Sequence, residues 1–305
     1  MSCENAPNNY KPKSSGNIHT ISVVIDRDLW KGNVGDELRN VFSSEFEGLP
    51  QQEPMFSLIH IPTKVFSGFT REGRNIIQVS RNNIDSTFIV KNKYASPQIV
   101  LTINGKTNKE IIKQLKKISS KAKLVFVNNE IKEKQKRIKK SVLKTDEFKS
   151  LGIDLTLPSA YRLFKKENQN KLWFQRETKK GSVNIITYTL PLSIGETDLN
   201  KVITIRDSIG KEFVPGRNEG SYIVTEKAYK PFFYKTKLRS FNAYETKGTW
   251  EVVNDYMAGP FLNYFIEDLK NNRILVVEGF VFSPSDRKRE YMVEIAAIIK
   301  SLRIL

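Results

Sequence analysis

The residues that could perform chemistry are few and scattered. The chain has 305 residues and two histidines, His19 and His60, each inside a predicted strand and neither beside a matching ligand pair. No HExxH, paired CxxC, EF-hand or Walker-type pattern occurs, and these are the spacings that place metal ligands or surround phosphates. We therefore expect no cofactor, no metal site and no catalytic residue of these kinds. Enzymatic activity stays open, and the pattern favours a non-catalytic protein.

Carboxylate chemistry needs only two acids at the right separation, as in glycoside hydrolysis. The candidates are Asp207, Glu219, Glu251, Asp255 and Glu278. Glu278 lies in the apolar run ILVVEGFVF, where an ionised carboxylate needs a partner. Arg206 or Arg273 could supply that partner. We interpret Glu278 as one member of a buried ion pair, with a carboxylate-based hydrolase of envelope polymers as the alternative.

A group of aromatic residues surrounds a Gly-Pro pair in the C-terminal part. Aromatic rings beside such a turn can stack on sugars or peptides. The candidate binding surface consists of Trp250, Tyr256, Gly259, Pro260 and Tyr264. The alternative is that these residues only anchor the core and its loops.

The elements that position these residues are clearest at the C-terminal end. The run Ile274 to Phe282 is typical of a central strand, and Phe261 to Asp268 is predicted to pair with it through a turn at Asn271-Asn272. After Pro284, Ser285 is predicted to cap a helix with one apolar face.

The rest of the chain predicts an α+β fold with mainly antiparallel sheets, helices packed on them and two similar-sized halves. The first half, residues 18–150, begins with a strand at 18–25 and a helix near Asn33. Its second helix begins at Thr107 or Asn108 and has an apolar stripe that ends at Ala122. A separate surface helix within 128–150 exposes its lysines. The second half, residues 151–305, contains several strands and a helix capped by Thr197 or Asp198.

The formal charge of +17 is concentrated in one stretch, Lys132 to Lys144, KEKQKRIKKSVLK. Such a charge can indicate a nucleic-acid binder. The other Lys and Arg residues are spread among Asn and Ile, a bias that an AT-rich genome also produces. We interpret the basic segment as a solvated helix face and expect no nucleic-acid partner, with a basic nucleic-acid binder as the alternative.

The only cysteine is Cys3, so no intrachain disulfide can form. It precedes ENAPNNYKPKSSGN, which is too polar to order itself. We therefore interpret residues 1–17 as a flexible tether. A cysteine, a polar tether and a folded part are the beginning of a mature bacterial lipoprotein. A signal segment would precede that cysteine, and only Met1 and Ser2 do so here. Either the sequence begins after that segment or Cys3 is an incidental exposed thiol.

Several separated strings resemble one family from Ile18 to Leu305. They include DLWKGNVGDELR at Asp28, GLPQQEPMFSL at Gly48, IRDSIGKEFVPGRNEGSYIVTE at Ile205, GTWEVVNDYMAGPF near Trp250, and VVEGFVFSP at the C-terminal end. The chain is similar to the uncharacterised lipoproteins of Bacteroidetes grouped as domain of unknown function 4837.

The resemblance implies an envelope protein held on the periplasmic side of a membrane by a lipid on Cys3. The family provides no known activity, cofactor or catalytic residue. We therefore expect a binding or assembly module with an unidentified envelope protein or glycan as its partner.

Overall fold

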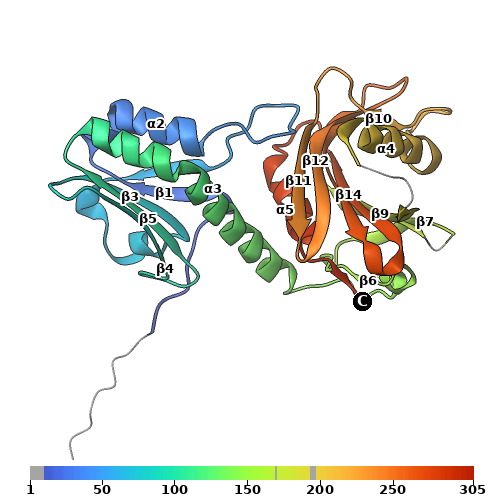
Figure 1. Ribbon diagram of the computed structural model, residues 1–305, viewed down its shortest axis with the longest axis horizontal. Coiled ribbons are helices and arrows are strands. Elements are labelled where there is room, and N and C mark those ends of the chain that lie inside the picture. Colours follow the sequence, from blue (N-terminus) through green and yellow to red (C-terminus); the bar gives the residue numbers. More distant parts are fainter. Residues whose placement is uncertain (1–9, 169, 193–196) are drawn as a thin grey trace, which may run out of the picture. The chain divides into compact units, whose positions relative to one another are not determined.

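The computed structural model describes residues 10–168, 170–192 and 197–305, and its contacts divide the chain into two compact units (Figure 1). The first unit consists of Met1–Glu45 and Pro54–Glu133, and the second of Phe46–Glu53 and Lys134–Leu305. The predicted α+β class with two halves is confirmed. Among the described residues, no helix has the length and apolar character needed to cross a membrane.

The first unit is a five-stranded sheet in the order β2-β1-β3-β5-β4. Its strands are β1 (Thr20–Val24), β2 (Ser57–Ile61), β3 (Asn75–Arg81), β4 (Ser86–Lys91) and β5 (Ile99–Gly105). Only β4 pairs with its neighbour in antiparallel orientation, and the β1-β2, β1-β3 and β3-β5 pairs are parallel. This sheet therefore differs from the antiparallel sheet expected for this half, because alternation along a strand does not encode the direction of its neighbour.

Helices cover one face of this sheet (Figure 1). They are α1 (Arg27–Lys31), α2 (Asn33–Phe42) and α3 (Asn108–Ile138). Their apolar residues form one core with the odd-numbered strand residues, such as Ile21, Val23 and Ile77. A smaller cluster around Phe66 lies on the opposite face, beside the 3-10 helices η1 (Thr63–Val65) and η2 (Gly68–Glu72).

Helix α3 is a single helix of 31 residues, so the prediction of two helices separated near Asn128 is wrong. Phe126 is fully buried in the core of the first unit, and this packing outweighs the weak helix propensity of the surrounding Val and Asn residues. Glu130 is also fully buried. Its carboxylate accepts hydrogen bonds from Arg74 Nε at 2.7 Å and from the backbone N–H of His19 at 2.7 Å.

The expected tether is not free of the fold over its whole length. The backbone N–H of Ser14 donates to Ser96 O, and that of Ser15 donates to Glu72 O. Arg74 N–H donates back to Ser15 O. These bonds join residues 13–15 to the edge of the first unit. Cys3, the expected lipidation site, lies outside the described residues.

The second unit is built on an eight-stranded antiparallel sheet in the order β10-β12-β13-β14-β9-β8-β7, with β11 also paired to β12. The strands are β7 (Arg162–Glu167), β8 (Lys171–Thr178), β9 (Gly181–Pro191), β10 (Ile223–Thr225), β11 (Phe232–Leu238), β12 (Phe241–Val252), β13 (Ala258–Asp268) and β14 (Arg273–Phe282). The short strands β6 (Ile153–Asp154) and β15 (Arg303–Ile304) form a separate pair, and η3 (Glu147–Leu151) and η5 (Leu269–Asn271) are 3-10 turns. The predicted turn into β14 is present, with Asn272 at φ +50°.

Two helices lie on opposite faces of this sheet (Figure 1). Helix α4 (Leu199–Phe213) covers the face that carries Glu278 and Phe280, because Arg206 of α4 contacts Glu278. Helix α5 (Arg289–Ile299) covers the other face, since a Cβ at Gly279 would lie 2.3 Å from Ile295 Cγ2. Successive strand residues point to opposite faces, so β14 is covered on both.

The N-terminus of α4 is capped by a residue next to it in sequence, whereas that of α5 is capped by a distant residue. Asp198 caps α4 as predicted, accepting a hydrogen bond from the backbone N–H of Lys201. The prediction that Ser285 caps α5 is wrong, because the helix begins at Arg289. Its first amides donate instead to the carboxylate of Glu53, with Lys288 N at 2.5 Å from Oε1.

Candidate functional site

A pocket lined by aromatic side chains lies on the α4 face of the second unit. Its volume is about 250 Å³. Strands β7, β8, β9, β12 and β14 form its floor, and the segments 214–217 and 252–257 contribute to its wall. The aromatic pocket, as we call it, is lined by Phe164, Trp173, Gln175, Ser182, Asn184, Val214, Pro215, Gly216, Arg217, Ile223, Trp250, Val252, Met257, Phe280 and Phe282.

The rings of the pocket contact one another across the sheet. Trp173 lies 4.5 Å from Phe164 and 6.1 Å from Phe280, measured between ring centroids. Trp250 lies 5.8 Å from Phe280 with its ring nearly perpendicular, and 6.3 Å from Phe282. Such edge-to-face and tilted pairs stabilise each other beyond the area they bury. The rings therefore form one continuous apolar wall.

A β-bulge places Phe164 over this wall. The register between β7 and β8 shifts between Leu163 and Lys165, so Phe164 is the extra residue. Its side chain is 58% exposed, whereas Trp173 beneath it is 5% exposed. Bulges often redirect one side chain towards a functional site. Phe164 is thus the part of the aromatic wall most open to an incoming group.

Asn184 fixes the polar side of the pocket. Its Oδ1 accepts hydrogen bonds from Trp173 Nε1 at 2.9 Å and from Gln175 Nε2 at 3.0 Å. Its Nδ2 donates to Ser182 Oγ at 3.0 Å. The amide is 1% exposed, so these bonds form away from water. The indole of Trp173 is therefore held in one orientation before any ligand arrives.

Two loops at the mouth of the pocket are joined by an ion pair. Arg217 Nε and Nη2 each lie 2.7 Å from one carboxylate oxygen of Asp255. The hydrogen bonds from Arg217 lower the pKa of the Asp255 carboxyl, and the same bonds raise the pKa of Arg217. The backbone N–H of Val253 also donates to Tyr222 O at 3.0 Å. These contacts hold the loop after α4 against the β12-β13 turn.

A buried ionic cluster lies beside the pocket, under α4. Glu278 Oε1 contacts Arg206 Nε at 3.0 Å and Nη2 at 2.9 Å, and Glu278 Oε2 accepts from Asn263 Nδ2 at 2.8 Å. Arg206 also donates to Thr225 Oγ1 at 3.0 Å and lies 3.9 Å from the ring centroid of Phe261. Arg206 is 3% exposed and Glu278 is 5% exposed. The two ions therefore neutralise each other's charge inside the core.

These contacts decide the role of the candidate carboxylates. Of the two candidate partners of Glu278, Arg206 is the one in contact, while Arg273 pairs with Asp268 at 2.7 Å. Asp207 accepts hydrogen bonds from the backbone N–H and the hydroxyl of Thr225. The void beside Glu278 and Arg206 has a volume of only about 10 Å³. Glu278 and Asp207 are thus engaged in structural contacts.

The five residues of the predicted aromatic surface do not lie together. Trp250 is buried at 2% exposure and lines the aromatic pocket, with Gly259 opposite it on β13. Tyr256 is fully exposed in the turn at the pocket mouth. Pro260 and Tyr264 are buried on the α5 face, where the Tyr264 hydroxyl donates to Glu245. These residues are close in sequence, but successive side chains of a strand point to opposite faces of the sheet, so they do not form one surface.

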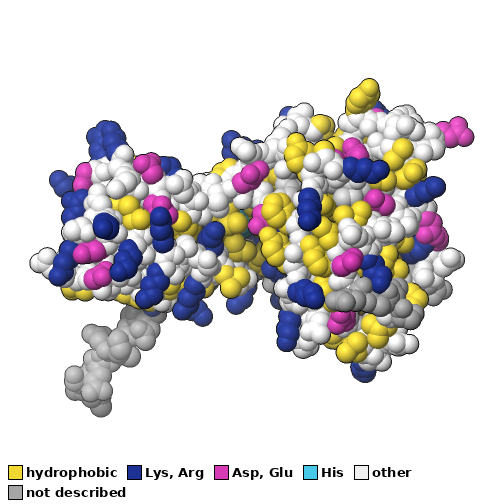
Figure 2. Space-filling view, turned by 45° about the horizontal axis from the view of Figure 1, so that its top comes forward, with side chains coloured by type: hydrophobic (Ala, Val, Ile, Leu, Met, Phe, Trp, Pro, Cys, Tyr) yellow, Lys and Arg dark blue, Asp and Glu magenta, His cyan; other side chains and the backbone are white. Residues whose placement is uncertain are grey.

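The remaining candidate residues have ordinary packing roles. His19 stacks on Phe56 and His60 stacks on Trp30. No group of three or more potential metal ligands comes together within the part of the chain that the structure describes. In the basic segment, Ile138 is buried, most of the Lys and Arg side chains are exposed as expected, and Lys134 is the exception because it pairs with Glu294 at 2.9 Å. Figure 2 shows Lys and Arg side chains spread over the visible face.

Sequence reasoning missed most of the pocket residues. Phe280 and Phe282 follow Glu278 at a spacing of two, which would have placed them on the same face of the strand as Glu278. Phe164, Trp173 and Asn184 carried no comparable signal, because only the pairing of β7, β8 and β9 with β14 brings them to this face.

Two family models match the chain. Residues 140–301 match the model described as domain of unknown function DUF4837, which is more than half of the chain and nearly all of the second unit. Residues 14–139 match a separate model, domain of unknown function DUF8532. The resemblance to DUF4837 that the sequence indicates from Ile18 to Leu305 is therefore shown for residues 140–301, and the part before them matches a different family. No curated protein sequence matches the chain.

Solved structures resemble about half of the chain at low identity. LpqN of Mycobacterium tuberculosis, described as involved in cell envelope biogenesis, is 14% identical, with 49% of this chain and 81% of LpqN covered at a TM-score of 0.30. The Ran-binding protein Mog1p of Saccharomyces cerevisiae is 8% identical, with 50% and 90% covered at 0.32. The protein of unknown function PA94 of Pseudomonas aeruginosa is 12% identical, with 53% and 94% covered at 0.29. TM-scores of this size carry no argument about function.

Proposed function

The chain belongs to the DUF4837 family, and we propose that it is a non-catalytic binding protein of the bacterial envelope, which captures an apolar side chain of a partner protein in the aromatic pocket. A lipid on Cys3 would hold it at the periplasmic side of a membrane. The observation that carries the binding role is the pre-set aromatic wall, in which Asn184 fixes Trp173 and the exposed Phe164 covers it.

The lining of the pocket favours a protein partner over a glycan. Specific binding of small groups uses a largely apolar cavity with a few placed polar groups, and the Asn184 side of this pocket provides them. A sugar-binding platform needs a flat ring face open to solvent, whereas Trp173, Trp250 and Phe280 are all nearly buried. Of the rings that line the pocket, only Phe164 is exposed. A side chain that inserts among the rings fits this arrangement better than a sugar that stacks on them.

Site-specific crosslinking in the native host tests the binding role. A photoreactive phenylalanine analogue at Tyr256, in the mouth of the pocket, should yield one adduct of discrete mass. The same analogue at Leu269 is the matched control, because Leu269 is 65% exposed and lies at the opposite end of the β13-β14 hairpin. Phe164→Ala should reduce the Tyr256 adduct at least about threefold. Equal labelling from both positions would refute the role of the pocket, and a carbohydrate adduct would identify a glycan instead.

The anchor rests on the position of Cys3 before a polar segment and on the family resemblance of the sequence. Two or more acyl chains give stable membrane attachment, whereas one chain alone is marginal. The test is the intact mass of the N-terminal peptide from the protein expressed by its own gene in its own host. An acylated Cys3 at the mature N-terminus is expected. An unmodified Met1-Ser2-Cys3 terminus in the cytosol would overturn the anchor and leave the pocket to be tested separately.

A further inference from the structure

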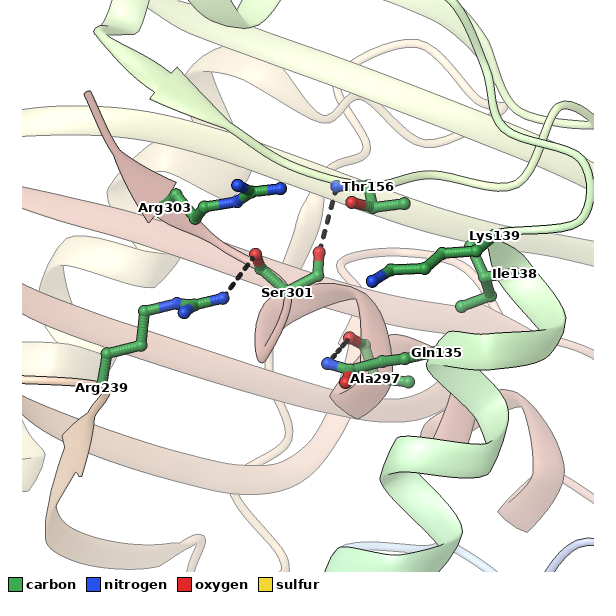
Figure 3. A pocket seen from close by; sticks show the side chains of 8 residues that line it. All are labelled: Gln135, Ile138, Lys139, Thr156, Arg239, Ala297, Ser301 and Arg303. Atoms are coloured by element: carbon green, nitrogen blue, oxygen red, sulfur yellow. Dashed lines mark hydrogen bonds between the residues drawn. The ribbon is translucent and has the colours of Figure 1, made fainter. Parts of the chain in front are cut away.

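A second cavity of the second unit is lined by cations (Figure 3). It has a volume of about 270 Å³ and lies where residues 135–139 at the end of α3 meet the end of α5 and the turn between β11 and β12. Lys139, Arg239 and Arg303 extend into it from three different segments (Figure 3). The polar side chains of Thr156 and Ser301 complete its wall.

The backbone acceptors of this wall are already engaged. The C-terminal end of a helix normally repels an anion through its free carbonyl groups. Here Ala297 O accepts from Gln135 Nε2 at 3.0 Å, and Ser301 O and Leu302 O accept from Arg239 at 3.3 and 2.6 Å. Ser301 Oγ accepts from the backbone N–H of Thr156 at 3.0 Å. The charged groups that line the cavity are all donors, namely the Lys139 ammonium and the guanidinium groups of Arg239 and Arg303, and the uncharged Thr156 hydroxyl and Gln135 amide lie beside them.

The charges around the cavity do not balance. The only carboxylate paired with these three cations among the described residues is Asp154, whose Oδ2 lies 3.3 Å from Arg303 Nε. Lys139 has no ion-pair partner in the same described ranges. Three positive charges around one cavity repel one another, so binding an anion there relieves the repulsion. Arg239 and Arg303 also offer planar forks, which suit the oxygens of a phosphate group.

The backbone of Arg239 supports a functional reading of the cavity. Arg239 adopts φ +55° in the turn between β11 and β12. Left-handed backbone costs a residue other than glycine roughly 1 kcal/mol, and such strain tends to occur at functional sites. A glycine or asparagine would relieve the strain, but it would lose the guanidinium that reaches Ser301 and Leu302.

We propose that this cavity binds the phosphate group of a phosphomonoester, which Lys139, Arg239 and Arg303 contact from three sides. The cavity is larger than one phosphate, so the phosphate is carried on a larger molecule, either a soluble metabolite or a lipid headgroup. The proposal does not depend on the aromatic pocket.

Calorimetric titration of the full chain at low salt tests the proposal, with glycerol 3-phosphate as the soluble probe and vesicles containing phosphatidic acid as the lipid probe. Lys139→Ala should weaken binding at least about tenfold. Lys140→Ala removes the same charge from an exposed neighbour outside the cavity lining, and it should weaken binding less than about twofold. Circular dichroism verifies that both variants are folded.

Lys139-dependent binding of glycerol 3-phosphate would assign the site to soluble phosphomonoesters. Lys139-dependent binding of the vesicles alone would assign it to lipid headgroups. Two results overturn the proposal: no saturable binding of either probe, or equal weakening by Lys139→Ala and Lys140→Ala. Equal weakening would mean that general surface charge, rather than the cavity, attracts the anion.

Discussion

Replacing Glu278 with alanine tests the account of the ionic cluster under α4. The change removes the hydrogen bond from Arg206 Nε, the ion-pair contact with Arg206 Nη2 and the hydrogen bond from Asn263. Arg206 remains 3% exposed in the wild-type packing, so its charge would stay in the core without its main partner. Thr225 would keep its hydrogen bond to Arg206, and Asp207 would be the nearest carboxylate, with its Oδ1 at 3.7 Å from Nη1.

The expected cost follows from these distances. Removing one partner of a buried ion pair destabilises a protein by about 3–5 kcal/mol. Asp207 compensates in part, because its side chain is only 29% exposed and it already lies near Arg206. We therefore expect the lower end of the range, about 3 kcal/mol. With a urea m-value of about 2 kcal/mol/M, the unfolding midpoint of the second unit falls by roughly 1.5 M.

Urea titration followed by tryptophan fluorescence measures this shift. Trp173 and Trp250 lie in the core of the second unit, and a Trp30→Phe background removes the signal of the first unit. Glu251→Ala is the matched control, since it removes a half-buried carboxylate from β12 of the same sheet and should cost no more than about 0.5 kcal/mol. A midpoint shift for Glu278→Ala no larger than that of the control would refute the reasoning.

The other predictions use the same titration or amide hydrogen exchange. Gly259→Ala places a Cβ 2.0 Å from a carbonyl oxygen of the facing strand, so the second unit should lose about 1–3 kcal/mol; an unchanged midpoint would contradict this. Glu130→Ala leaves Arg74, 2% exposed, unpaired in the first unit, and the loss there should be about 3–5 kcal/mol by Trp30 fluorescence, with no change in the second unit. The pKa of Asp255 is lowered in the folded state, so its contact with Arg217 is fully present above the ordinary Asp pKa and is lost as pH falls through the lowered value. Protection factors in the loop 253–257, which correct for the slower intrinsic exchange at low pH, should fall on acidification in the wild type. In Arg217→Gln they should already be low at neutral pH and should approach the wild-type values in acid.

Local patterns predicted the C-terminal hairpin because its signals are short-range. The apolar run of β14 occurs at 273–282, one residue from its predicted start. Asn272 takes the left-handed conformation that Asn tolerates, and Asp198 caps the helix that follows it. In each case the residue and the group that satisfies it lie within a few positions of one another.

Features that depend on distant residues were not predictable. Glu53 caps α5 across more than two hundred residues, so Ser285 looked like the better candidate. An ionisable residue in an apolar run predicted that Glu278 needs a partner, but only the placement of α4 selects Arg206 over Arg273. The aromatic pocket was less accessible still, because it combines a bulge at Phe164 with strands that meet only in the finished sheet.

The cap on α5 has a consequence for how the second unit is made. Residues 46–53 leave the ribosome long before β14 and α5, yet they belong to the same folding unit. In a ribosome-bound chain that does not yet include Arg289, the Glu53 carboxylate lacks the backbone N–H groups that it accepts hydrogen bonds from in the folded protein. A fragment that begins at Lys134 contains α5 but lacks Glu53, and the loss of a helix cap costs about 0.5–2 kcal/mol. The second unit can therefore complete its fold only once α5 has emerged, and it is less stable in a chain that lacks residues 46–53.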